Sequence, residues 1–265
     1  MVGICYVFLK PKCRIFCPVL FYFPPVQQST GFSISIQIFG DWYVADKTRV
    51  RIFVDFWNFQ IQWNELHTSL GAKEVVSIPW KELAQVLCAE VGKGEPVKFT
   101  GALIYASINS NSPKDKGLNN WLHHVLASYT GYSVIVKERK PRKTIKCQED
   151  NCKTPVTNCP SCKAPLKGTV EKGIDAAIIT DLLSLAFDDN YDIAILISGD
   201  ADYAPAVEYI QKKTDKQIIQ AFFKAHGDEL RNKCWEHIFF EDLMPKLIGG
   251  PTTATPAKPA APIKK

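Results

Sequence analysis

The stretch Ile195–Tyr203, ILISGDADY, places two carboxylates one residue apart directly after a run of apolar residues. The apolar run is typical of a buried strand, and Asp200 and Asp202 stand where that strand should end. A second buried run, Arg49–Asp55 (RVRIFVD), also ends in an aspartate. Two strands that end in carboxylates predict a polar site along one edge of a covered sheet.

Strand-like and helix-like segments alternate on both sides of this stretch. We expect strands at 49–55, 97–107, 132–139, 191–198 and 216–223, and helices at 77–91, 116–129, 173–187 and 203–213. Such alternation predicts right-handed βαβ units, and therefore an α/β fold with a mainly parallel central sheet and helices on both faces. In that architecture ligands bind at the carboxyl ends of the strands, near the point where the strand order reverses.

Composition and length predict one large domain with small additions. With 265 residues, 46% of them hydrophobic, the chain is long enough to bury a substantial core, which excludes disorder throughout. We expect four segments: an N-terminal extension 1–48, the main domain 49–248, an inserted cysteine segment 147–166, and a disordered Pro/Ala/Lys tail 249–265. The apolar part of the extension is short and contains prolines, so we expect it to be peripheral to the fold, as a mis-chosen start would also make it; a membrane anchor is the alternative.

Four carboxylates are expected to meet at the carboxyl edge of the sheet. They are Asp55, Asp175, Asp200 and Asp202. Several carboxylates at close range repel one another unless a divalent cation neutralises them, and an all-oxygen donor set favours Mg²⁺ or Mn²⁺. Such a site suits phosphodiester hydrolysis by an activated water, which Asn58 and Ser198 would help to orient. Each aspartate taken alone is as well explained as a turn or helix-cap residue.

Three motifs resemble a known family. IFVDFWNF (Asp55, Asn58), KGIDAAIITDLL (Asp175, Asp181) and LISGDADYAPAV (Ser198, Asp200, Asp202) are similar to the motifs of NYN-domain proteins of the LabA-like group, within the PIN-like nuclease superfamily. The resemblance covers roughly residues 49–247. It implies a PIN-like three-layer α/β/α sandwich and magnesium-dependent ribonuclease activity, in which the four aspartates bind the metal and Asn58 and Ser198 are their motif neighbours.

The chain departs from the usual family pattern in two places. The cysteine segment interrupts the path from the third strand to the third helix, and the aromatic residues Phe56, Trp57 and Phe59 are bulky for a position beside a substrate groove. We expect Trp57 to pack rather than to stack bases, and His67 to lie in a polar loop.

Four cysteines within 16 residues predict a structural zinc site. Cys147, Cys152, Cys159 and Cys162 follow the pattern C-x4-C-x6-C-x2-C, and thiolates in two close pairs can bind Zn²⁺ tetrahedrally. Because four thiolates fill the coordination sphere, this zinc would be structural, as an inserted zinc ribbon. Clustered thiols without a convincing secretory signal also indicate a reducing, cytoplasmic location.

Basic residues are concentrated beside this segment. Residues 137–172 hold ten Lys and Arg against four Asp and Glu, whereas the whole chain has a net charge of only +5. A local excess of this kind suits the nucleic-acid backbone, although a charge run is as often only a solvated face. The candidate nucleic-acid-binding residues are Lys137, Arg139, Lys140, Arg142, Lys143 and Lys146.

Together these features predict a metal-dependent ribonuclease that holds RNA with the help of a zinc-ribbon insertion, with no membrane contact. The alternative is a non-catalytic RNA-binding or regulatory module of the same fold. A phosphatase-like hydrolase with an aspartyl nucleophile would need an Asp-x-Asp at the first strand, where Trp57 stands instead. The sequence leaves open DNA as a substrate, the mode of cleavage and the oligomeric state.

Overall fold

The structure is a computed structural model that describes residues 47–71, 76–141, 145–147, 149, 151–164 and 169–248. The predictions for the tail 249–265, for Arg142 and Lys143, and for nearly all of the extension 1–48 fall outside the described residues.

Strands of four to eleven residues, most of them apolar runs, form the central sheet. Its strands are β1 (Arg49–Asp55), β2 (Lys98–Ile108), β3 (Tyr132–Glu138), β8 (Ile193–Ile197), β9 (Gln217–Phe222) and β10 (Glu236–Phe239). The six strands lie in the order β10-β9-β8-β1-β2-β3, and every neighbouring pair is parallel. The chain runs outward from β1 to β3 and then crosses to β8 on the other side of β1. The strand order therefore reverses between β1 and β8, where an α/β sheet normally binds its ligand.

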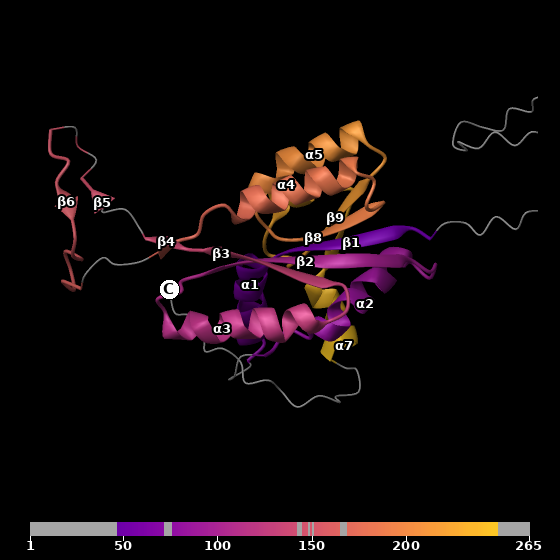
Figure 1. Cartoon of the computed structure of the whole chain (residues 1–265), viewed down its shortest axis with the longest axis horizontal. Coiled ribbons are helices and arrows are strands. Elements are labelled where there is room, and N and C mark those ends of the chain that lie inside the picture. Colours follow the sequence, from indigo (N-terminus) through magenta and orange to yellow (C-terminus); the bar gives the residue numbers. More distant parts are fainter. Residues whose placement is uncertain are drawn as a thin grey trace, which may run out of the picture. The chain divides into compact units, whose positions relative to one another are not determined.

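Helices cover both faces of the sheet, as Figure 1 shows. One layer holds α1 (Phe56–Ser69), α2 (Trp80–Gly92), α3 (Pro113–His124) and α7 (Phe240–Ile248). The other holds α4 (Ile174–Phe187) and α5 (Ala204–Lys213), with the short α6 (Asp228–Arg231) contributing Leu230 to the same core. Two 3₁₀ turns, Leu126–Ser128 and Ala201–Tyr203, complete the described helical segments. The α/β class with a mainly parallel sheet is thus confirmed.

Helix α1 corrects two predictions. The loop assignment of His67 was wrong, because His67 lies in the last turn of α1 and is buried. The aromatic residues before it recur at helical spacing, and Phe56, Phe59 and Trp63 are buried in the core rather than placed beside a groove. Only Trp57 of the first aromatic run is partly exposed. The bulk of this run therefore packs α1 against the sheet.

The predicted helix at 116–129 begins earlier and ends earlier than expected. Ser112 caps α3 by accepting a hydrogen bond from the backbone N–H of Asp115, and Pro113 follows it in the first turn. A capping serine followed by proline is a common start for a helix. The α-helix then ends at His124, and the 3₁₀ turn at Leu126 continues toward β3.

The inserted segment adds two small antiparallel pairs. Strand β4 (Lys140–Pro141) pairs with β7 (Thr169–Val170), and β5 (Ile145–Lys146) pairs with β6 (Pro155–Val156). The β4–β7 pair closes the base of the insertion between β3 and α4. We call this pair the stem.

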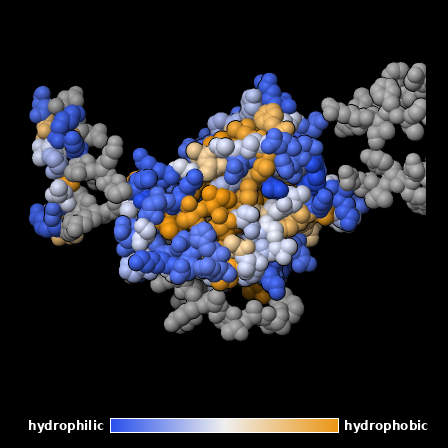
Figure 2. Space-filling model, in the orientation of Figure 1, coloured by the Kyte–Doolittle hydropathy of each residue, from blue (hydrophilic) through white to orange (hydrophobic). Residues whose placement is uncertain are grey.

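Hydrophobic surface lies between the two helical layers in Figure 2, where the β3 edge of the sheet faces the viewer. Three consecutive residues of β3, Val134, Ile135 and Val136, are only partly buried. Within the described part of the chain, none of the helices is long and apolar enough to span a bilayer.

Candidate carboxylate site

Asp55 stands at the junction of β1 and α1, and its side chain is almost fully buried, with 4% exposed. Its Oδ1 caps α1 by accepting a hydrogen bond from the backbone N–H of Asn58 at 3.3 Å. Its Oδ2 accepts hydrogen bonds from the hydroxyls of Ser198, at 3.4 Å, and Tyr203, at 3.1 Å. The prediction that Asp55 ends a strand at the carboxyl edge is confirmed, and its oxygens accept hydrogen bonds from α1 and from the segment that follows β8.

Tyr203 links two of the predicted carboxylates. Its hydroxyl lies 3.1 Å from Oδ2 of Asp55 and 3.1 Å from Oδ1 of Asp175, which is in the first turn of α4. One hydroxyl has one proton, so it donates to one carboxylate at a time. Asp55 and Asp175 are 120 residues apart in sequence, and the single hydroxyl of Tyr203 lies within hydrogen-bond distance of both.

The loop after β8 is joined to the start of α1. Asn58 accepts a hydrogen bond from the backbone N–H of Gly199 at 3.0 Å, and the buried Ser198 hydroxyl accepts one from the backbone N–H of Asp200 at 3.1 Å. A Cβ built on Gly199 would lie 2.2 Å from the ring of Phe222. Glycine is therefore needed here because the loop packs directly on β9. Asn58 and Ser198 position the loop that carries Asp200.

Asp200 and Asp202 follow on the same rim with different surroundings. Asp200 is partly buried and caps the 3₁₀ turn by accepting a hydrogen bond from the backbone N–H of Asp202 at 2.9 Å. Asp202 is exposed. The structure therefore links Asp55, Asp175 and Asp200 through Tyr203 and Ser198, and leaves Asp202 at the solvent side.

The electrostatics of the site favour a neutral Asp55. Burial raises the pKa of Asp55 to about 7, and the negative charges of Glu171 and Asp175 act in the same direction, against hydrogen bonds from Asn58 and Tyr203. Burial and the neighbouring Asp55 and Asp175 also raise the pKa of Tyr203 above its ordinary value, so its hydroxyl keeps its proton and acts as donor. A buried carboxylate among other carboxylates is a group that a cation would stabilise strongly.

Besides Tyr203, three residues of the site were missed from the sequence: Glu171, Ser107 and Gln220. Glu171, directly after β7, is one of the charges that Asp55 experiences, and it accepts a hydrogen bond from the buried Ser107 hydroxyl at the end of β2. Gln220 on β9 is 1% exposed and donates from Nε2 to the carbonyl oxygens of Ser198, at 3.0 Å, and Gly227, at 3.2 Å. A glutamine inside the apolar run Ile218–Phe223 was the one signal available.

Asp181 lies behind the site. Its Oδ2 accepts a hydrogen bond of 2.6 Å from the hydroxyl of Tyr105, the residue that pairs with Asp55 across β1 and β2. It therefore supports the strand end from the α4 side and has no contact with Tyr203 in the described bonds.

The four cysteines form two turns of the same design. In each, the backbone N–H of the first cysteine donates to the carbonyl two residues after the second: Cys147 to Thr154 at 2.9 Å, and Cys159 to Ala164 at 2.8 Å. The residue after each second cysteine, Lys153 or Lys163, has a left-handed backbone with φ of 46° or 57°. Hydrogen bonds from Thr154 and Cys147 lower the pKa of Cys152, and those from Cys162 and Ser161 lower that of Cys159. Both turns therefore stabilise a thiolate.

The donor types fit the groups predicted for them, although the ligand sets are not assembled. In the described ranges no three His, Cys, Asp or Glu side chains are grouped closely enough to hold a metal ion. The rim offers only oxygen donors, including a buried carboxylate with a raised pKa, which suits Mg²⁺ or Mn²⁺. The thiols come together in pairs, which suits Zn²⁺.

The described candidate nucleic-acid residues lie along the path into the insertion. Lys137 is exposed on β3, Lys140 on β4 and Lys146 on β5. Arg139 is more buried and reaches the rim, where its Nε donates to the Ser107 hydroxyl at 2.9 Å.

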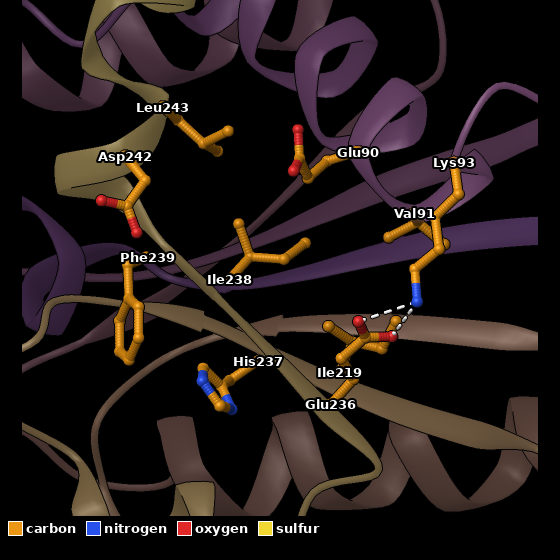
Figure 3. Close-up of a pocket in the computed structure, with 10 residues that line it drawn as sticks. All are labelled: Glu90, Val91, Lys93, Ile219, Glu236, His237, Ile238, Phe239, Asp242 and Leu243. Atoms are coloured by element: carbon orange, nitrogen blue, oxygen red, sulfur yellow. Dashed lines mark hydrogen bonds and ion pairs between the residues drawn. The ribbon is translucent and has the colours of Figure 1, made fainter.

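A separate cavity of about 330 Å³ lies between α2, α7, β9 and β10 (Figure 3). None of the four aspartates predicted for the metal site lines it. The acids that line it are each paired with a lysine: Glu236 with Lys93 at 2.8 Å, Glu90 with Lys246 at 2.6 Å, and Asp242 with Lys224 at 2.5 Å. The carboxylates of the cavity are thus already neutralised by lysines, and the rim is the better candidate for chemistry.

Comparison with solved structures gives only weak likenesses. A protein of unknown function from Vibrio parahaemolyticus is 21% identical with a TM-score of 0.47, over 75% of this chain and 96% of that one. A Sir2 enzyme is 12% identical with a TM-score of 0.32, over 77% of this chain and 91% of that one. No curated protein matches the chain significantly.

The family model of the NYN domain matches residues 49–242, which is most of the chain. The match spans β1, α4 and the loop after β8, the three elements that bring Asp55, Asp175 and Asp200 to one rim. NYN domains belong to the PIN-like nuclease superfamily, and this chain belongs to the NYN domain family.

Proposed function

We propose that this chain is a ribonuclease of the LabA-like NYN group that hydrolyses RNA phosphodiester bonds with Mg²⁺ or Mn²⁺. The observation that carries the proposal is the Tyr203 hydroxyl between Asp55 and Asp175, at 3.1 Å from each, beside the Ser198 bond to Asp200. Asp55, Asp175 and Asp200 would hold the metal, with Asp202 completing the site from the solvent side. A bound divalent cation would supply a more acidic water and neutralise charge on the phosphate.

The protein residues around the rim have positioning roles in this proposal. Tyr203 keeps its proton and fixes the distance between Asp55 and Asp175. Asn58 holds Gly199, and Ser198 holds the backbone of Asp200, so the β8 loop keeps its carboxylates over β1. Lys137, Lys140 and Lys146 are exposed on the segment that leaves the rim and suit contacts with RNA phosphates.

The test is cleavage of end-labelled single-stranded RNA by the full chain with Mn²⁺, Mg²⁺ or EDTA. Asp55→Asn and Asp200→Asn should each reduce cleavage by at least about 100-fold. Asp189→Asn is the matched control, because Asp189 lies at the opposite end of β8 and pairs with Arg49 at 2.8 Å. Full activity in a folded Asp200→Asn variant, or equal activity in EDTA, would refute the assignment.

A non-catalytic RNA-binding module is the second candidate. It is favoured by the absence, among the described side chains, of a preassembled group of three metal ligands. Such a module would bind RNA with an affinity that falls with salt, and would give no product in Mn²⁺.

We further propose that the insertion is a zinc ribbon held by Cys147, Cys152, Cys159 and Cys162. The support is the shared design of the two cysteine turns: each has the same backbone hydrogen bond and a lysine whose backbone is in the left-handed conformation. The six described cysteines are free thiols, which agrees with a reducing, cytoplasmic location. Elemental analysis should find one zinc per chain, lost in Cys159→Ser/Cys162→Ser and retained in the control Cys234→Ala. Retention of zinc in the double variant would contradict the proposal.

A further inference from the structure

The stem of the insertion meets the carboxylate rim at four side chains, which we call the stem cluster: Trp57, Ser107, Arg139 and Glu171. Arg139 immediately precedes β4 and Glu171 immediately follows β7, and between them Lys140 pairs with Val170. The two residues at the foot of the stem therefore carry opposite charges and face the same part of the rim.

Arg139 is fixed in place before any ligand arrives. Its backbone N–H donates to the carbonyl of Ile108 at 2.6 Å, and its Nε donates to the Ser107 hydroxyl at 2.9 Å. Its guanidinium lies over the ring of Trp57, 4.9 Å from the centroid, and Trp57 is itself oriented by donating from Nε1 to the Ser107 carbonyl at 2.6 Å. A guanidinium held on an aromatic face keeps its remaining N–H donors aligned for a planar anion.

The anion that Arg139 faces in the free protein is Glu171. Its Oε2 lies 3.9 Å from the guanidinium and also accepts the hydroxyl hydrogen of Ser107. The ion pair is at the long limit for such contacts, and its side chains are 24% and 33% exposed. A partly solvated pair of this length contributes little, so it can be exchanged at small cost.

The stem cluster also adjoins the carboxylate site. The negative charge of Glu171 raises the pKa of Asp55 more than the charge of Asp175 does. Trp57 is two residues beyond Asp55, on the first turn of α1. The carboxylates of the rim repel a polyanion such as RNA. Arg139 places a positive charge beside them that can attract it.

We propose that Arg139 binds a backbone phosphate of single-stranded RNA beside the carboxylate rim, and that Glu171 holds that place in the nucleic-acid-free protein. This inference rests on the proposed function and adds the residue that receives the substrate. On binding, the guanidinium exchanges the Glu171 carboxylate for two phosphate oxygens while Ser107 and Trp57 keep it in position. Trp57 thus supports the arginine, in agreement with a packing role.

The experiment measures binding rather than cleavage. The full chain is titrated in EDTA against a fluorescein-labelled 12-nucleotide RNA, and anisotropy is recorded at several salt concentrations. Arg139→Ala should weaken binding by about tenfold and reduce the slope of log affinity against log salt by about 0.7, as for one lost contact to a single strand. Arg139→Lys, which keeps the charge but not the planar fork, should lose less affinity and retain the slope.

Glu171→Gln tests the exchange. It should tighten binding by about two- to fivefold, because the competing carboxylate is gone. In the Arg139→Ala background the same change should have a clearly smaller effect, since there is no guanidinium to release. Lys212→Ala is the charge-matched control. Helix α5 starts at the rim and runs away from it, and Lys212 is exposed near the far end of this helix, so its removal should leave RNA affinity unchanged.

The outcomes separate this inference from the proposed function. If the wild type binds and cleaves RNA but Arg139→Ala and Arg139→Lys bind like the Lys212→Ala control, the inference is wrong and the ribonuclease stands. If the wild type binds without cleaving and Arg139→Ala is weakened, the phosphate contact stands without the enzyme. No binding by a folded wild type overturns both. A DNA strand of the same sequence should bind with the same dependence on Arg139, because the contact is to phosphate.

Discussion

Replacing Asp55 with asparagine should stabilise the metal-free fold at neutral pH while removing the predicted activity. The carboxyl group of Asp55 has its pKa raised from 3.8 to about 7, chiefly by burial. Between these two values the unfolded chain ionises at this position and the folded chain does not. The free energy of unfolding of the wild type therefore falls as pH rises from about 4 to about 7, by about 1.4 kcal/mol per unit and about 4 kcal/mol in total, and then levels off.

Asparagine does not titrate, so the difference in unfolding free energy between Asp55→Asn and the wild type isolates this group. Asparagine is also a good helix cap, and the difference between asparagine and a neutral Asp55 in their hydrogen bonds to Ser198 and Tyr203 does not depend on pH. The difference should rise steadily in favour of the variant from pH 4.5 to 7 and stay constant above pH 7.5. Urea denaturation of the full chain in EDTA at half-unit pH intervals measures it.

The matched control is Asp189→Asn. Hydrogen bonds from Lys216 and Arg49 lower the pKa of Asp189 to about 2, so its stabilising ionisation is lost only as pH falls below about 4. The difference in unfolding free energy between Asp189→Asn and the wild type should therefore be constant between pH 5 and 8. A flat profile for Asp55→Asn over the same range, or a difference that favours the wild type more as pH rises, would refute the reasoning.

Three further predictions concern the support of the rim. Gly199→Ala should lower the free energy of unfolding by about 1–3 kcal/mol, because the added Cβ would lie 2.2 Å from the ring of the buried Phe222; a urea midpoint equal to the wild type's would contradict this. Tyr203→Phe should lower the free energy of unfolding by about 1–3 kcal/mol, because it removes the hydrogen-bond donor to Asp55 and Asp175. The loss should be larger at pH 8 than at pH 5, and equal losses at both pH values would show that the hydroxyl does not donate to ionised carboxylates. Gln220→Ala should cost about 1–3 kcal/mol and reduce RNA cleavage, since the carbonyls of Ser198 and Gly227 lose their donor; full cleavage at unchanged stability would be the contrary result.

The sheet was predictable because its strands are short apolar runs separated by segments of helical spacing. The same reasoning failed at α1, where the aromatic residues Phe56 and Trp57 follow β1 directly, with no Gly or Pro between strand and helix. Asp55 acts at once as the last residue of the strand and the cap of the helix, so the usual break between two elements is absent. The final β10 and α7 were also not predicted; they follow each other in the same way, with Phe239 ending one and Phe240 beginning the other.

The carboxylates were predictable and their connections were not. Asp55, Asp175 and Asp200 occupy strand or helix ends, which a parallel sheet brings to one edge. Tyr203 has no sequence feature that separates it from a core tyrosine, and its role follows only from the turn that aims its hydroxyl back over β1. Glu171 and Ser107 meet because the stem returns the chain to the end of β2, a contact that depends on how the insertion closes.

The position of the stem has a consequence for how the chain finds its fold. The two halves of the sheet, β1-β2-β3 and β8-β9-β10, are each continuous in sequence, and the insertion lies in the one connection that crosses between them. Closing a loop costs entropy that rises only with the logarithm of its length, about 0.6 kcal/mol for each doubling. Once Lys140 pairs with Val170, the insertion becomes a side branch and the crossing is short again. This connection can therefore accept inserts of very different lengths with little effect on the stability of the sheet, provided that both ends of the insert pair at the stem.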